Sequence, residues 1–163
     1  CFVKESSPLA SIDGARNAII TDSSHAGRSL FDGLGAGGDP TASSVVSDVI
    51  DIAKGINNYT FGLPVNNLRK VEHIKIDQRK GSFYVRFTVI DRKGVFADIG
   101  SIFNQNSISM ETVLQKNHDS IDNKIILIIT HEIKESFLKK AIKDLELRDF
   151  VVDKPKFIRI ENI

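Results

Sequence analysis

The sequence is poor in sulfur and lacks tryptophan: its 163 residues include one cysteine, one methionine and no tryptophan. The lone Cys1 cannot form a disulfide within the chain, which excludes a disulfide-rich secreted fold and fits a reducing compartment. The longest uninterrupted apolar run, Ile125 to Ile129, is far shorter than the roughly 20 residues that a membrane-spanning helix needs. The N-terminus also lacks the basic and apolar regions of a signal peptide. We therefore expect a cytoplasmic protein with no membrane partner.

The sequence has no large excess of charge of either sign, because its 22 lysine and arginine residues nearly balance its 21 aspartate and glutamate residues. The net charge is +1. This balance provides no bulk field for nucleic acid, so no nucleic-acid partner is expected. No metal site is expected either, because the four histidines have no metal-ligand spacing and no cysteine partners; they are His25, His73, His118 and His131. The sequence also lacks a nucleophile elbow, a P-loop and a paired-carboxylate constellation.

The remaining composition, 41% hydrophobic and 26% charged, is that of an ordinary globular protein. The chain starts with Cys1 instead of Met, and its first ten residues read as a strand and turn from inside a domain, so we expect a fragment of a longer protein. A polar, irregular stretch around Pro64 divides the chain. We predict one unit over residues 1–57, a connector over 58–80 and a second unit over 81–163. Units of this size bury modest cores, which favours docking or dimerisation.

The first unit contains two short strand-like runs, 17–21 and 29–32, followed by a helix. Asp39 is the expected N-cap of this helix, Pro40 its first residue, and Gly55 lies just past its end. Apolar residues at helical spacing predict one buried face, made of Ala42, Val45, Val46, Val49, Ile50 and Ala53. The unit thus reads as strands plus one helix, without the neighbours that complete a sheet.

The second unit shows a regular alternation of patterns. The expected elements are, in chain order, a strand over 83–89, a helix over 95–103 that stops at Asn106, strands over 107–116 and 124–130, a helix over 137–145 and a strand over 157–160. This order is the βαββαβ arrangement of the ferredoxin-like fold, so the chain as a whole is predicted to be α+β. Right-handed crossovers place both helices on one face of the sheet. The uncovered face or the sheet edges predict a homodimer. On the second helix, Lys139, Lys140 and Lys143 are interpreted as a solvated face.

The loop GLGAGG, residues 33–38, satisfies the G-x-G-x-x-G pattern, whose glycines allow a backbone to approach a pyrophosphate at a helix N-terminus. The confirming acidic residue should follow about 20 positions later, at the end of a second parallel strand. That window falls in the connector, so a complete Rossmann unit is not predicted. Two interpretations stay open: an anion-accepting helix start flanked by Thr41 and Ser43, or a tight strand-to-helix turn.

The turn Asp91-Arg92-Lys93-Gly94, before the first helix of the second unit, is a further candidate site. Gly94 lets the backbone approach a ligand, and the free amides of Val95 and Phe96 can hold a carboxylate. A plain connecting turn is the alternative. The next predicted strand begins at Ser107 and carries Gln115, which faces solvent or a dimer mate. The candidate effector residues are Asp91, Gly94, Val95, Phe96, Ser107 and Gln115.

Three stretches together carry a family resemblance: Pro8-Leu9-Ala10 with Gly14 and Asn17-Ala18; GLGAGGDPTASSVVSDVIDIA; and SISMETVLQK with the later Thr130-His131-Glu132. In this order the sequence resembles homoserine dehydrogenase, whose catalytic domain ends with such a glycine loop and helix and is followed by an ACT amino-acid-sensing domain. The resemblance covers nearly the whole chain. It implies that residues 1–57 are the end of the catalytic domain and residues 81–163 the ACT regulatory domain.

The resemblance also implies function. Homoserine dehydrogenases interconvert aspartate semialdehyde and homoserine with NADP or NAD, in threonine and methionine biosynthesis. Gly37, with Gly35 and Thr41, is then the position that approaches the nicotinamide dinucleotide, while the catalytic residues lie outside this chain. The chain alone is expected to be inactive and to bind no cofactor.

By this resemblance the ACT unit is expected to sense an end product, threonine, although Lys93 stands where ACT domains often have proline. An ACT module of another biosynthetic enzyme or regulator is the alternative function. It would explain residues 81–163 and leave the helix after GLGAGG without a role.

Overall fold

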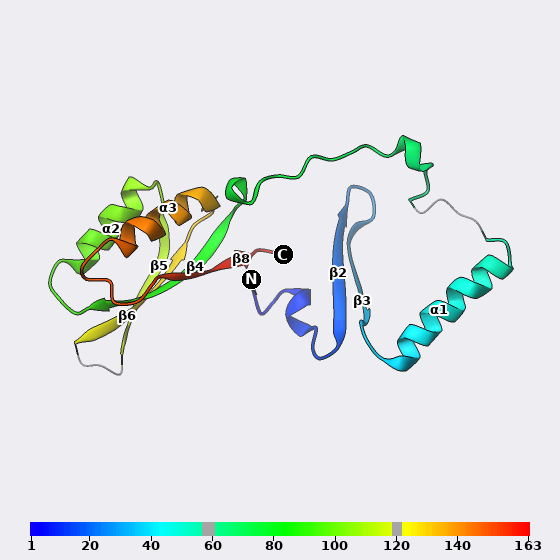
Figure 1. Ribbon diagram of the computed structural model, residues 1–163, viewed down its shortest axis with the longest axis horizontal. Coiled ribbons are helices and arrows are strands. Elements are labelled where there is room, and N and C mark those ends of the chain that lie inside the picture. Colours follow the sequence, from blue (N-terminus) through cyan, green and yellow to red (C-terminus); the bar gives the residue numbers. More distant parts are fainter. Residues whose placement is uncertain (57–60, 119–121) are drawn as a thin grey trace. The chain divides into compact units, whose positions relative to one another are not determined.

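The computed structural model describes residues 1–56, 61–118 and 122–163 (Figure 1). These residues form two compact units, one made of Cys1–Lys4 and His73–Ile163 and the other of Glu5–Glu72. Strands and helices occur in both, which confirms the α+β class. Part of the predicted connector, residues 58–60, lies outside the described residues. None of the helices in the described ranges is long and apolar enough to cross a membrane.

The unit of residues 5–72 contains a β-hairpin and a helix. After a short 3-10 helix, Pro8–Ser11, strands β2 (Arg16–Ser23) and β3 (Gly27–Leu34) pair antiparallel along their full length. The hairpin reverses where the Ala26 amide donates a hydrogen bond to Ser23 Oγ at 2.9 Å. Both predicted strands are therefore confirmed, and each finds its described partner in the other. A second 3-10 helix, Val65–Asn67, follows later in the unit.

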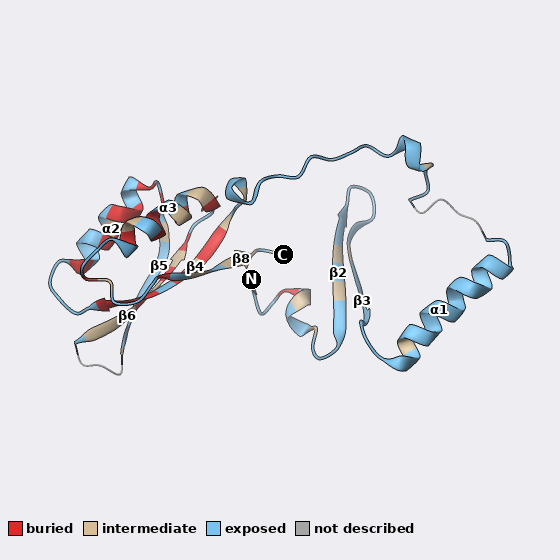
Figure 2. Ribbon diagram, viewed as in Figure 1, coloured by how far each residue is buried: buried red, intermediate tan, exposed pale blue. Residues whose placement is uncertain are grey.

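Helix α1 (Gly38–Ala53) differs from its prediction in two ways. Its N-cap is Gly37, and Asp39 lies in the first turn, so the predicted Asp39 cap is wrong. The predicted apolar face exists but is exposed: 56% of Val45 and 58% of Val49 are accessible to solvent. Figure 2 shows exposed residues along most of the helix. The helical spacing identified an apolar face correctly, but the described residues of this unit leave it exposed.

The other unit is a sheet with two helices on one face. The strand order is β1 (Phe2–Val3), β8 (Lys156–Glu161), β4 (Lys80–Ile90), β6 (Asn123–Thr130) and β5 (Met110–Asn117). Strand β4 is antiparallel to both β6 and β8, β6 is antiparallel to β5, and β1 is parallel to β8. Helices α2 (Val95–Gln105) and α3 (Glu135–Glu146) cover the sheet (Figure 1). The short strand β7 (Ile133–Lys134) pairs with the start of β4, which a 3-10 helix, Ile76–Gln78, precedes.

The core lies between the sheet and these helices, where buried residues concentrate (Figure 2). The alternation in β4 is confirmed, because Phe83, Val85, Phe87 and Val89 are all buried. Asn106 ends α2 as predicted. The strand expected from residue 107 begins only at Met110. Ser107 adopts φ +57, a left-handed turn conformation that a strand cannot contain, so the chain turns before β5 starts.

Candidate functional site

The glycine loop joins β3 to α1, and Gly37 fixes its shape. Gly37 has φ +134, a region that residues with a side chain rarely enter. A Cβ added there would lie 3.1 Å from Pro40 Cγ. The Thr41 amide donates a hydrogen bond to Gly37 O at 3.2 Å, which closes the first turn of the helix. The backbone geometry by itself therefore requires glycine at position 37.

Gly35 has a different reason to be glycine. Its amide donates to Ala15 O at 2.9 Å, which ties the loop to the chain just before β2. A Cβ added at Gly35 would lie 1.7 Å from Asn17 Nδ2. The structure thus brings the predicted cofactor residues Gly35, Gly37 and Thr41 together at one end of α1. Their contact with a cofactor remains a prediction.

The loop offers some of the backbone donors that a dinucleotide phosphate needs. The N-terminus of α1 has no side-chain cap among the described residues, so its first amides are free to donate to an anion. A Cβ at Gly38 would meet no described atom within 4 Å, which leaves the backbone open to approach. Pro40 has no amide hydrogen, however, and Asp39 adds a negative charge to the first turn. The loop therefore fits one edge of a dinucleotide and cannot enclose its phosphates alone.

The second predicted site lies where β4 leads into α2. Gly94 is the N-cap of α2 in a left-handed conformation, φ +92, and no described side chain caps the helix start. A Cβ at Gly94 would meet no described atom within 4 Å, so this side of the turn is open. Val95 is 3% exposed, which places its side chain in the core and leaves only its amide for a ligand. Phe96 is 48% exposed.

Ion pairs hold this turn. Arg92 donates two hydrogen bonds to Asp149, at 2.8 and 3.0 Å, and its guanidinium lies 5.7 Å from the ring centre of Phe150. The hydrogen bonds from Arg92 lower the pKa of Asp149 below its ordinary value. Asp91 faces Lys124 at 3.4 Å, so it already has a cationic partner. These contacts restrain the residues on the N-terminal side of Lys93.

The predicted effector residues are spread over the Gly94 turn, the far end of α2 and strand β5. Ser107 follows the other end of α2, roughly 16 Å from the Gly94 turn for a helix of 11 residues. It lines a cavity of about 430 Å³ with residues from the end of α2 and the start of β5. Gln115 is exposed on β5, which pairs only with β6 among the described strands. The expectation that these residues bind one effector, at or near a dimer interface, stays a prediction.

An ion-pair network that the sequence did not reveal joins the start of β4 to α3 and β8. Glu135 is fully buried and accepts two hydrogen bonds from Arg159, both at 2.7 Å. Lys139 lies 3.2 Å from Glu135 and 2.6 Å from Asp77, so it is not simply a solvated lysine as predicted. The hydrogen bonds from Arg159 lower the pKa of Glu135 despite its burial. Arg79 pairs with Glu161 in the same region.

The comparisons with known proteins agree along the chain. Residues 1–50 match the family model described as homoserine dehydrogenase. The chain is 39% identical to homoserine dehydrogenase of Helicobacter pylori and 31% identical to that of Neisseria gonorrhoeae, over 99% of its own length and 38% and 39% of theirs. A crystal structure of a homoserine dehydrogenase from Thiobacillus denitrificans matches 98% of this chain at a TM-score of 0.86 and 30% identity, over 37% of that chain. The chain thus spans less than two fifths of the relatives that it matches.

Proposed function

Because this chain belongs to the homoserine dehydrogenase family, we propose that it completes the catalytic domain of such an enzyme and adds an amino-acid-sensing module. The proposed parent activity is the interconversion of aspartate semialdehyde and homoserine with NADP or NAD, on the route to threonine and methionine. The observation that carries the proposal is the 39% identity to the Helicobacter pylori enzyme along 99% of this chain. The proposed location is the cytoplasm.

The glycine loop is the proposed contribution of this chain to catalysis. The bound nicotinamide cofactor exchanges the hydride, and the loop residues Gly35 and Gly37 position their backbone against it. The exposed apolar residues of α1 and the hairpin support this role, because surfaces of that kind indicate an interface. Phe31 is 62% exposed, Leu34 60% and Val49 58%. We propose that the rest of the catalytic domain covers them and thereby fixes the loop.

The chain by itself is expected to have no dehydrogenase activity. Its glycine loop follows an antiparallel hairpin, and the described residues contain no strand-helix-strand unit around it that could hold the whole cofactor. Purified chain should therefore produce no reduced cofactor from homoserine with either NAD or NADP. Absorbance of the reduced nicotinamide measures this. Turnover that persists at constant specific activity through purification would overturn the proposal.

Residues 81–163 are the proposed ACT domain. The element order β4-α2-β5-β6-α3-β8, with both helices on one face, supports this assignment. The match of residues 1–50 to homoserine dehydrogenase favours this family over an ACT module from another enzyme or regulator. Since β5 has a free edge among the described strands, we propose that threonine binds between the Gly94 turn of one copy and β5 of a second. Its carboxylate would accept hydrogen bonds from the free amides at the α2 start.

Threonine binding is expected to depend on Gly94. Replacing Gly94 by valine should weaken binding at least about tenfold, because a β-branched residue is strained at φ +92 and distorts the donor amides. Gly94→Asn tests whether backbone strain alone causes the loss of binding. Asparagine tolerates the left-handed region, so it adds a side chain beside the amides with little strain. Gly100→Ala, in the middle of α2, is the matched control that should bind normally. Calorimetry measures all four proteins. Equal binding by Gly94→Val would contradict the site.

A homodimer through the β5 edge is the second expectation for this domain. Strand β5 has a free edge among the described strands, and it presents Val113 at 40% and Leu114 at 46% exposure. An unpaired strand edge with apolar side chains is a surface suited to pairing. Sedimentation velocity should show a dimer that Leu114→Glu shifts toward monomer. Leu147→Glu is the matched control, because Leu147 is 83% exposed at the end of α3 and should leave the dimer intact. A monomeric wild-type chain would count against this assembly.

A further inference from the structure

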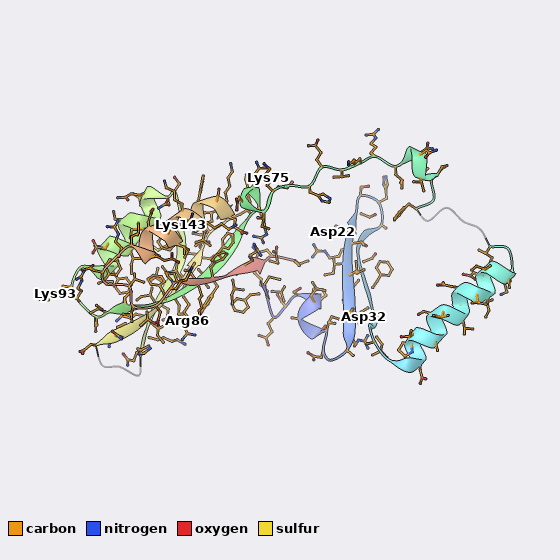
Figure 3. The ribbon with its side chains drawn as sticks, viewed as in Figure 1. Asp22, Asp32, Lys75, Arg86, Lys93 and Lys143 are labelled. Atoms are coloured by element: carbon orange, nitrogen blue, oxygen red, sulfur yellow. The ribbon has the colours of Figure 1, made fainter. Side chains whose placement is uncertain are left out.

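A basic cavity lies on the face of the sheet opposite α2 and α3. Its volume is about 430 Å³, and it is lined by Arg86, Phe87 and Thr88 of β4, His118 after β5, Asp153 and Lys154 before β8, and Lys156 of β8. Figure 3 labels Arg86 on the side of the sheet away from the helices. The side chains of Arg86, Lys154 and Lys156 bring three positive charges and Asp153 one negative charge, a net charge of +2. None of its lining residues belongs to the glycine loop or to the Gly94 turn.

The sheet register places two of these cations against each other. Arg86 and Lys156 are directly opposite partners in the antiparallel pair of β4 and β8. Opposite residues in such a pair project on the same face with their Cβ atoms roughly 5 Å apart, and like charges there are destabilising. Within the described ranges, neither side chain forms an ion pair. A bound anion would convert this repulsion into two attractive contacts.

The neighbouring groups complete a set of donors on rigid elements. Thr88 is 6% exposed, and its carbonyl accepts a hydrogen bond from the Val152 amide at 2.9 Å, which fixes this part of β4 against the chain before β8. Lys154 is only weakly engaged, since its ion pair with Glu146, the one it forms among the described residues, measures 3.6 Å and its side chain is 80% exposed. The guanidinium fork of Arg86 suits two oxygens of one phosphate, and Lys156 suits a third.

We propose that this cavity binds a small metabolite through a phosphate dianion. The charge of a phosphate monoester matches the net charge of +2, and its tetrahedral oxygens can meet donors from β4 and β8 at once. A cavity of about 430 Å³ leaves room for an organic portion beside the phosphate. The proposal does not depend on the dehydrogenase or on threonine sensing.

Calorimetry with inorganic phosphate on the full chain, at constant ionic strength, tests the site. Arg86→Gln and Lys156→Gln should each weaken phosphate binding at least about tenfold, because each removes a charge-assisted hydrogen bond. The double variant Lys140→Gln/Lys143→Gln is the matched control: it removes two exposed positive charges from α3 and should change binding less than about twofold. Malonate, a dicarboxylate of similar charge, should bind more weakly than phosphate.

The unliganded protein provides a second measurement. Without phosphate, Arg86→Gln should raise the unfolding temperature, because it removes the repulsion from Lys156, and added phosphate should raise that of the wild type only. Phosphate binding that is absent, or equal in wild type and both variants, would overturn the site. Malonate binding as tight as that of phosphate would overturn the assignment of a phosphate ligand.

Discussion

Replacing Gly37 by valine in the proposed homoserine dehydrogenase of which this chain is a part is expected to lower kcat/KM for homoserine by at least about 100-fold, because a displacement of about 1 Å near the reacting groups has an effect of that size. Gly37 adopts φ +134, where a β-branched residue is strained. Its Cβ would also approach Pro40 Cγ and Cδ to 3.1 and 3.2 Å. Since Pro40 is part of the first turn of α1, the valine must shift either the loop or the helix start.

A matched substitution separates the effect of the loop from that of a lost glycine. Gly100 lies inside α2, where an added Cβ would meet no described atom within 4 Å, so Gly100→Ala should keep the wild-type kcat/KM. Alanine there should also raise the free energy of unfolding by up to about 1 kcal/mol, since it favours helix. Wild-type kcat/KM in Gly37→Val would show that the loop does not position the reacting groups.

The buried carboxylate of Glu135 gives the largest expected effect on stability. Glu135→Gln should lower the free energy of unfolding by about 3 kcal/mol, the lower end for breaking a buried ion pair, because the Arg159 side chain is 38% exposed and partly solvated. The carboxylate takes both donors of Arg159 and also faces Lys139. Glu146→Gln, which removes an ion pair of 3.6 Å to the exposed Lys154, should cost less than about 1 kcal/mol. Denaturant titration measures both variants.

The same carboxylate predicts a pH dependence. Hydrogen bonds from Arg159 hold the folded-state pKa of Glu135 below its ordinary value. A depressed pKa contributes stability that is fully present above the unfolded-state pKa, about 4.3, and is lost as the pH falls through the folded-state pKa. The difference in stability between wild type and Glu135→Gln should therefore be constant near neutral pH and shrink under acid. A difference that stays the same at pH values well below 4 would contradict this account.

Secondary structure was the part of the fold most open to prediction from the sequence. The strict alternation of Phe83, Val85 and Phe87 predicted the strand β4. The helical spacing of apolar residues, with a stop at Asn106, predicted the helix α2. These patterns record which side of each element is apolar, a local property. The prediction failed where a single backbone angle decided the outcome. Because Ser107 adopts φ +57, β5 begins three residues later than predicted, at Met110. The N-cap of α1 is Gly37 and not Asp39, the residue that the sequence had predicted.

The candidate sites were less predictable, because they depend on contacts between distant residues. Arg159 and Glu135 are 24 residues apart, and Asp77 and Lys139 are 62 apart, so neither pair forms a motif in one sequence. The basic cavity depends on the register of β4 with β8, which only the folded sheet defines. The glycine loop was found from sequence since its residues are contiguous. The exposed face of α1 was missed because periodicity cannot tell what covers an apolar surface.

The most direct test of the account is the rate of homoserine oxidation by this chain, alone and joined to the remaining catalytic portion of a homoserine dehydrogenase. We expect no NAD- or NADP-dependent turnover by the chain alone, and turnover by the joined protein that Gly37→Val lowers by at least about 100-fold. Turnover by the purified chain alone would contradict the proposed function, as would a joined protein whose rate is unchanged by Gly37→Val.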